Sequence, residues 1–183
     1  MAIGRRILVL GTSGSGKTTV ADRLARARGL PHIELDALHW EPNWREAETA
    51  VFQQRVRAAL DAAPDGWVLD GNYFNKVDPV TTAAADTLVF LDLPLPLVLG
   101  RLVRRTIRRW RTREVLWSGN RERLHALFTR DSLLLWALRT HRRNRGRYRR
   151  RIHDAGPPLV AVRLRTPRQV RRFLDAEAAA TRP

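Results

Sequence analysis

Short apolar runs separated by longer amphipathic stretches follow one another along the chain. The apolar runs predict strands over residues 7–10, 30–35, 67–69, 87–93 and 159–164. Helical spacing of apolar residues predicts helices over residues 20–28, 46–63, 95–112, 121–130, 132–151 and 168–178, with loops over 37–44 and 113–120. Strands that alternate with helices are typical of parallel sheets covered on both faces. The pattern therefore predicts an α/β fold of three layers around a five-stranded parallel sheet.

A glycine-rich turn lies between the first predicted strand and the first predicted helix. Its sequence, GTSGSGKTT, fits the phosphate-binding pattern G-x-x-x-x-G-K-[ST] of a P-loop NTPase fold. Backbone N–H groups of such a loop surround phosphate oxygens, and the following helix adds the positive end of its dipole. Lys17 is expected to reach the β- and γ-phosphates of a nucleoside triphosphate, and the Thr18 hydroxyl to bind Mg²⁺. The predicted nucleotide-binding residues here are Gly11, Thr12, Ser13, Gly14, Ser15, Gly16, Lys17, Thr18 and Thr19.

Three of the predicted strands end in or next to an aspartate. Phosphoryl transfer needs carboxylates near the phosphates, to hold Mg²⁺ and to orient or deprotonate the acceptor. Asp70 follows three apolar strand residues and is the predicted metal ligand together with Thr18, whereas Asp36 is predicted to act on the acceptor. Asp92 precedes Pro94 and is interpreted as part of a structural turn. For each of them, a carboxylate that only caps a helix or ends a strand is the alternative.

Aromatic residues gather near the second and third strand ends. Trp40, Trp44 and Tyr73 could stack on a planar acceptor or fill the hinge of a lid. His39 lies between Leu38 and Trp40 and is interpreted as a structural histidine. Both alternatives for the aromatic set stay open at this point.

Composition narrows the class of protein. The 183 residues include no cysteine, which excludes disulfides and thiolate metal sites. No apolar run reaches the roughly 18–20 residues of a membrane span. The residues before the first strand lack the apolar segment of a signal peptide. We therefore expect a cytoplasmic protein with one domain over residues 1–183, acting as a monomer or homodimer without membrane contact.

The net charge of +16 is concentrated in the second half of the chain. Residues 101–151 hold 18 arginines against 3 acidic residues and are predicted to form a helical insertion that serves as a lid. Helical spacing is expected to bring Arg101, Arg104, Arg105, Arg108 and Arg109 to one face and Leu99, Val103, Ile107 and Trp110 to the opposite face. Lid arginines clamp a triphosphate and neutralise charge in the transition state. Arg101 is the predicted nucleotide contact, and Arg105 and Arg108 are the predicted catalytic arginines.

The densest part of the insertion is residues 141–151. Its arginines could bind nucleic acid through the phosphates without sequence specificity. The interpretation that the sequence favours is a solvated helix face that keeps the protein soluble.

Four stretches carry a resemblance to a known group of proteins: residues 11–19, 35–44, 67–73 and 111–122. With them, the chain resembles small P-loop kinases related to adenylate, shikimate and gluconate kinases. It is most similar to the bacterial topology modulation or adenylate-kinase-like proteins. The resemblance implies ATP and Mg²⁺ as cofactors, a mobile lid and transfer of the γ-phosphoryl group. It also implies that Asp70 holds Mg²⁺ through water and that Arg165 and Pro167 lie in the loop against adenine.

The resemblance bears on the acceptor as well. Asp36 is placed like an aspartate of shikimate kinases, which implies a hydroxyl acceptor. Asn72, Tyr73 and Phe74 replace the F-P-R that follows Asp-Gly in adenylate kinases. Residues 32–80 also offer few arginines for an acceptor phosphate, which favours an acceptor other than AMP.

The sequence thus predicts an ATP-dependent kinase that acts on a small-molecule acceptor, either nucleotide- or nucleoside-like or hydroxyl-bearing. Two alternatives remain. One is a nucleic-acid-binding protein, or a kinase of nucleic-acid ends, that uses residues 101–151. The other is an ATP-binding switch with little transferase activity.

Overall fold

A computed structural model describes residues 3–73, 76–122, 133–154 and 158–180 of the chain. The helix predicted over residues 121–130 lies almost entirely outside these described residues. The statements below concern the described part of the chain.

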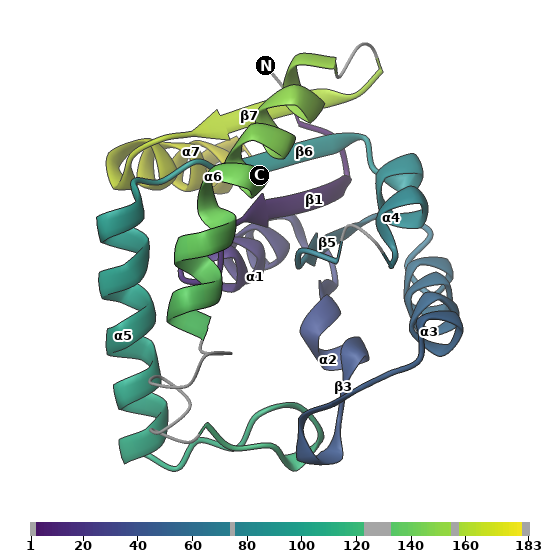
Figure 1. The fold of residues 1–183 in the computed structure, drawn as a ribbon. Helices are drawn as coiled ribbons and strands as arrows, with labels where there is room; N and C mark the ends of the chain where they lie inside the picture. Colours follow the sequence, from purple (N-terminus) through teal and green to yellow (C-terminus); the bar gives the residue numbers. More distant parts are fainter. Residues whose placement is uncertain (1–2, 74–75, 123–132, 155–157, 181–183) are drawn as a thin grey trace.

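A five-stranded sheet forms the centre of the fold (Figure 1). Its strands are β1 (Arg6–Gly11), β2 (His32–Glu34), β5 (Trp67–Asp70), β6 (Thr87–Leu91) and β7 (Val160–Leu164). The spatial order is β2-β5-β1-β6-β7, and every neighbouring pair is parallel. The predicted five-stranded parallel sheet is therefore confirmed. Because the strands are parallel, their carboxyl ends all meet at one edge, where ligands bind in open α/β sheets.

Helices cover both faces of this sheet. The longer ones are α1 (Lys17–Arg28), α3 (Thr49–Asp61), α4 (Asp78–Ala84), α5 (Leu95–Arg111), α6 (Leu133–Asp154) and α7 (Pro167–Ala180). Ile7 and Val9 of β1 pack with α1 and α7, whereas Leu8 and Leu10 pack with α3, α4 and α6. Successive side chains of a strand point to opposite faces, so one strand supplies both cores. This arrangement confirms the three-layer α/β fold.

The segment after β2 differs from the predicted loop. It forms the short helix α2 (Leu35–His39) and then a hairpin of β3 (Trp40–Glu41), the 3-10 turn η1 (Pro42–Trp44) and β4 (Arg45–Glu46). Asn43 and Trp44 have positive φ angles, 62° and 58°, which turn the chain back on itself. The helix α4 was not predicted either, because it is short. Residues 35–46 thus form a compact unit beside the edge of the sheet.

The buried face of α5 also differs from the prediction. Val98, Leu102 and Thr106 are buried, whereas Ile107 and Trp110 are 40% and 46% exposed. Val98 and Leu102 lie against the glycine-rich loop, because a Cβ added at Gly14 would meet atoms of both residues. This contact rotates the helix away from the orientation that its most apolar residues suggested. Leu99, Val103, Ile107 and Trp110 lie opposite the arginines, as predicted, but this apolar side is not the side that the core covers.

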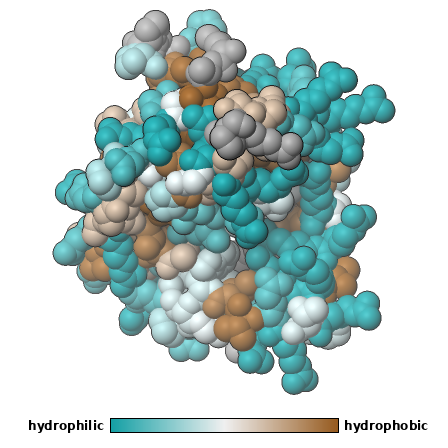
Figure 2. All heavy atoms as spheres, turned by 180° about the vertical axis from the view of Figure 1, so that it is seen from behind, coloured by the Kyte–Doolittle hydropathy of each residue, from teal (hydrophilic) through white to brown (hydrophobic). Residues whose placement is uncertain are grey.

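The surface is largely polar. Figure 2 shows the back of the molecule covered mainly by hydrophilic side chains, with separate hydrophobic patches between them. Within the described ranges, no helix combines the length and the apolar character that a membrane crossing requires.

Candidate active site

The P-loop, residues 11–19, joins β1 to α1. Two of its glycines have backbone angles that other residues rarely adopt, with φ of 86° at Gly14 and 95° at Gly16. A Cβ at Gly14 would also lie 2.7 Å from the carbonyl oxygen of Val98 in α5, so this position requires glycine. Helix α1 begins at Lys17, and no side chain caps its N-terminus. The N–H groups of its first turn and the helix dipole make this end a suitable phosphate site.

Lys17 lies close to two of the predicted site carboxylates. Burial lowers the pKa of Lys17, and the negative charges of Asp70 and Asp36 partly offset this shift. Arg105 of α5 adds a positive charge that lowers the same pKa. The fold thus brings together Lys17, Asp36, Asp70 and Arg105 from four separate segments of the sequence.

Asp70, the last residue of β5, is buried with 4% exposure. Its Oδ2 has no hydrogen-bond partner in the described part of the protein and lies 3.9 Å from His32 Nε2. Burial lowers the pKa of His32, but the Asp70 carboxylate outweighs burial, and the pKa lies above its ordinary value. Burial and the same carboxylate raise the pKa of Glu34. Sequence reasoning missed His32 and Glu34, although their spacing of two along a predicted strand puts both on one face.

Asp36 lies in the first turn of α2, because β2 ends at Glu34, one residue earlier than predicted. Its Oδ1 accepts a hydrogen bond of 2.5 Å from the hydroxyl of Tyr73. The ring of Tyr73 lies 4.4 Å from the ring of His39, which is 1% exposed and also contacts Phe52. His39 is therefore a packed core residue, in agreement with its structural interpretation. The cluster fixes the position of the Tyr73 hydroxyl.

The five arginines predicted to share one face of α5 fall into two groups by burial. Arg101, Arg105 and Arg109 follow one another at intervals of four and are partly buried. The Nη1 of Arg101 donates a hydrogen bond of 3.0 Å to the Ser15 carbonyl oxygen in the P-loop. Arg105 and Arg109 share the carboxylate of Glu122, at 4.0 Å and 3.0 Å. Burial and the neighbouring Arg109 lower the pKa of Arg105, so its surroundings would favour a bound anion.

The second group, Arg104 and Arg108, lies on the exposed side of the helix. Arg108 pairs with Glu114 at 3.4 Å and is 65% exposed. All five positions lie on one side of the helix, as helical spacing predicts, but only Arg101, Arg105 and Arg109 are partly buried. Arg108, a predicted catalytic residue, follows Arg105 by three positions on the helix, but its side chain is exposed and paired with Glu114.

The segment after α5 lies against the hairpin that follows α2, and we call residues 112–122 the connecting segment. Its Asn120 donates to the Glu41 carbonyl oxygen and accepts from the Trp44 N–H, both at 2.9 Å. Its Trp117 donates to Glu34 Oε2 at 3.1 Å. Trp44 Nε1 adds a bond of 3.2 Å to the backbone of Arg121. These contacts join two segments that are distant in sequence, and they do so next to Asp36 and Asp70. Sequence reasoning missed the roles of Asn120 and Trp117.

Asp92 follows β6 at the same edge of the sheet. It is 2% exposed and accepts hydrogen bonds from Arg145, Arg149 and Arg163. Burial alone would raise its pKa, but these guanidinium groups outweigh burial and hold the pKa below its ordinary value. Its interpretation as a structural residue agrees with this arrangement.

A histidine of α6 and the loop after β7 also lie near the P-loop. The buried His141 of α6 lies with Nδ1 3.2 Å from the Thr12 hydroxyl, a contact that sequence reasoning missed. The predicted adenine loop lies directly after β7, where Arg165 is exposed and Pro167 begins α7. The N–H of Arg165 donates to Gln169 at 2.6 Å. Both the loop and His141 therefore lie at the end of the sheet that carries the P-loop.

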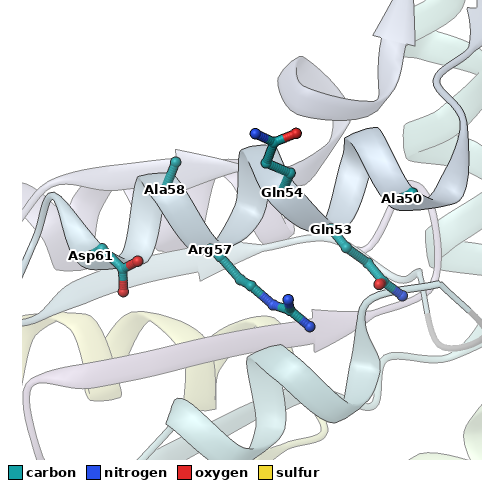
Figure 3. Close-up of a pocket in the computed structure, with 6 residues that line it drawn as sticks. All are labelled: Ala50, Gln53, Gln54, Arg57, Ala58 and Asp61. Carbon is teal, nitrogen blue, oxygen red and sulfur yellow. The ribbon is translucent and has the colours of Figure 1, made fainter.

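A shallow hollow elsewhere on the surface is not part of this site. Figure 3 shows its lining residues, which all come from the single helix α3. They are Ala50, Gln53, Gln54, Arg57, Ala58 and Asp61. None of them is among the predicted site residues, so the hollow is a feature of one helix surface.

Solved structures that share this fold include three kinases. A sugar kinase from Janibacter sp. HTCC2649 is 21% identical with a TM-score of 0.52, over 98% of this chain and 99% of that chain. A gluconokinase from Sinorhizobium meliloti 1021 is 22% identical with a TM-score of 0.53, over 99% and 95%. A shikimate kinase from Bacteroides thetaiotaomicron is 15% identical with a TM-score of 0.53, over 98% of both chains. The fold is therefore that of small P-loop kinases.

A comparison with curated proteins found no match. A family model described as an AAA domain matches residues 7–123, well over half of the chain. The match includes the P-loop, Asp36, Asp70 and the arginines of α5. The chain therefore belongs to this AAA domain family.

Proposed function

We propose that the protein is an ATP-dependent kinase that moves the γ-phosphoryl group of ATP to a hydroxyl of a small molecule. The observation that carries this proposal is the convergence of Lys17, Asp36 and Asp70 at the P-loop end of the sheet. A P-loop alone serves many NTPases, whereas a second carboxylate beside the phosphates suits transfer to an acceptor. Arg165 and Pro167, at the same edge, are proposed to contact adenine. The closer resemblance to topology modulation or adenylate-kinase-like proteins stays a prediction from the sequence.

The residues present suit a magnesium ion. Asp70 has a buried carboxylate oxygen without a hydrogen-bond partner in the described part of the protein. Thr18 is exposed at the start of α1, where its hydroxyl is free to turn toward a bound phosphate. Mg²⁺ in phosphate sites takes one or two protein oxygens and completes its shell with phosphate and water. Thr18 and Asp70 would therefore hold the ion, which would neutralise charge on the β- and γ-phosphates.

Asp36 is the proposed acceptor residue. The hydrogen bond from Tyr73 holds one carboxylate oxygen and leaves the other available to a substrate hydroxyl. Asp36 would orient this hydroxyl and take its proton as the bond to phosphorus forms. Lys17 and Arg105 supply positive charge for the transferred group.

The arginines of residues 32–80, which are the segment around the proposed acceptor residue Asp36, favour an acceptor without a phosphate group. Arg45 and Arg55 are both paired with Glu41, at 2.7 Å and 3.2 Å. Arg57 lies on the exposed surface of α3, in the hollow of Figure 3. A phosphate-bearing acceptor would need a guanidinium group of its own, because phosphate is best bound by the arginine fork. We therefore propose a sugar-like, hydroxy-acid or nucleoside acceptor rather than AMP.

The test is ADP release from ATP–Mg²⁺ with a panel of sugars, hydroxy acids, nucleosides and nucleoside monophosphates. One small acceptor should stimulate release, and Asp36→Asn should abolish the stimulation while ATP still binds. Asp61→Asn is the matched control, because Asp61 is an exposed carboxylate on α3. Lys17→Ala should lose turnover with every acceptor. If ATP binds tightly but no acceptor in the panel stimulates ADP release, the result would instead support an ATP-binding switch.

A further inference from the structure

Seven of the eight arginines of α6 fall into two sets. Arg145 and Arg149 are hydrogen-bonded to the buried Asp92, and Arg151 is paired with Asp78. These three help to hold α6 on the sheet. The other set is exposed and makes no ion pair within the described ranges: Arg139, Arg142, Arg143 and Arg150.

The exposed set forms a stripe along the helix. Its members follow at intervals of three, one and seven residues, which keeps them on one side of an α-helix. From Arg139 to Arg150 the stripe extends about 16 Å at 1.5 Å per residue. The sequence from 135 to 147 contains no acidic residue, so no carboxylate of α6 lies within a helical turn of Arg139, Arg142 or Arg143.

The opposite side of α6 is packed against the protein. Ala137, His141, Asn144 and Tyr148 are all buried, and Figure 1 shows α6 lying across the front of the sheet. The stripe therefore lies on the side of α6 that faces away from the core. The helix backbone that carries the row is already ordered, so only the arginine side chains lose conformational freedom when anions bind.

We propose that this stripe of α6 binds the phosphate backbone of nucleic acid. Guanidinium groups match phosphate oxygens in a bidentate geometry and are less strongly hydrated than ammonium groups. A duplex carries one negative charge per about 1.7 Å of its axis, so the length of the stripe spans several phosphates. Because no base-reading element is involved, binding is independent of sequence.

An anionic membrane surface and a protein partner suit the stripe less well than nucleic acid. A helix that lies on a membrane inserts an apolar face between the headgroups, but the apolar residues of α6 such as Ala137 and Tyr148 are buried in the core. A protein partner would need apolar or aromatic anchors at the centre of the contact. Leu138 is exposed by 51% but is followed directly by the charged stripe.

The test is fluorescence anisotropy of labelled single-stranded and duplex oligonucleotides, titrated with the full chain over a series of salt concentrations. A triple variant, R139Q/R142Q/R143Q, is compared with R168Q/R171Q/R172Q on α7, which removes the same charge from another exposed surface. The α6 variant should weaken binding about tenfold or more and reduce the salt slope by about 2 to 3. The α7 variant should leave both quantities close to those of the parent.

Several outcomes would overturn the proposal. Equal losses in both triple variants would mean that binding follows net charge alone, and the absence of oligonucleotide binding would exclude the surface altogether. Binding to vesicles of anionic lipid without binding to oligonucleotides would assign the stripe to a membrane. The replaced side chains are exposed, and thermal unfolding of each variant checks that the fold is kept.

Discussion

The hydroxyl of Tyr73 donates a hydrogen bond of 2.5 Å to Asp36, although the two residues follow different strands. Burial raises the pKa of Tyr73, and the nearby Asp36 carboxylate raises it further, so the hydroxyl stays a donor at neutral pH. His39 packs against the same ring and keeps it in place. One oxygen of the proposed acceptor carboxylate is thus held by the protein itself.

Replacing Tyr73 with phenylalanine removes this hydrogen bond and keeps the ring. A hydrogen bond to a charged group contributes about 1.5–3 kcal/mol, which corresponds to a loss of about ten- to a hundredfold in kcat if it acts in the transition state. The KM for ATP should not change, because the hydroxyl does not contact the P-loop. Steady-state kinetics with the acceptor found in the panel would measure both. An unchanged kcat would mean that Asp36 does not depend on Tyr73.

Replacing Asn120 with alanine tests the contact between the connecting segment and the hairpin. The side chain is 5% exposed and pairs with the Glu41 carbonyl and the Trp44 N–H. Leaving such buried groups unpaired costs about 1–3 kcal/mol, so the free energy of unfolding should fall by this amount in denaturant titrations. Ser118→Ala is the control, because Ser118 is exposed and makes a single bond to the Trp40 carbonyl. Equal effects of the two variants would contradict a special role for Asn120.

The parts of the fold that depend on local sequence could be predicted. The P-loop is a contiguous motif, and its flanking strand and helix follow directly, so residues 7–28 were within reach of sequence patterns. The parallel sheet followed from apolar runs between amphipathic stretches. Asp70 was recognisable because a strand of apolar residues leads into it.

Other features depend on contacts that the sequence does not display. The orientation of α5 is set by the close approach of Gly14 to Val98, and this contact outweighs the more apolar side of the helix. The pairing of Asn120 with the hairpin joins residues that are more than 70 positions apart. Arginine also has several uses on one helix, so composition alone could not separate Arg145, which binds Asp92, from the exposed Arg142.

Asp92→Asn tests whether the buried carboxylate stabilises the fold. The substitution removes a negative charge that Arg145, Arg149 and Arg163 share. Breaking a buried pair in this way leaves uncompensated charge and costs about 3–5 kcal/mol; partial exposure of these arginines places the expected value at the lower end. Chemical denaturation would measure the loss, with the exposed Asp61→Asn as control. A loss equal to that of the control would show that the arginines are solvated without help from Asp92.

His39 predicts a dependence of stability on pH. Burial lowers the pKa of His39, and Lys76 lowers it further, so the folded protein keeps the ring neutral where the unfolded chain, with a pKa near 6.5, takes up a proton. Stability should therefore fall as pH decreases through about 6.5, by up to about 1.4 kcal/mol per pH unit for one proton. His39→Gln removes this titration and should flatten the pH profile of thermal unfolding relative to the parent. His32 and His141 titrate in both proteins, so the difference between the profiles isolates His39. A slope in His39→Gln equal to that of the parent would mean that His39 is protonated inside the fold.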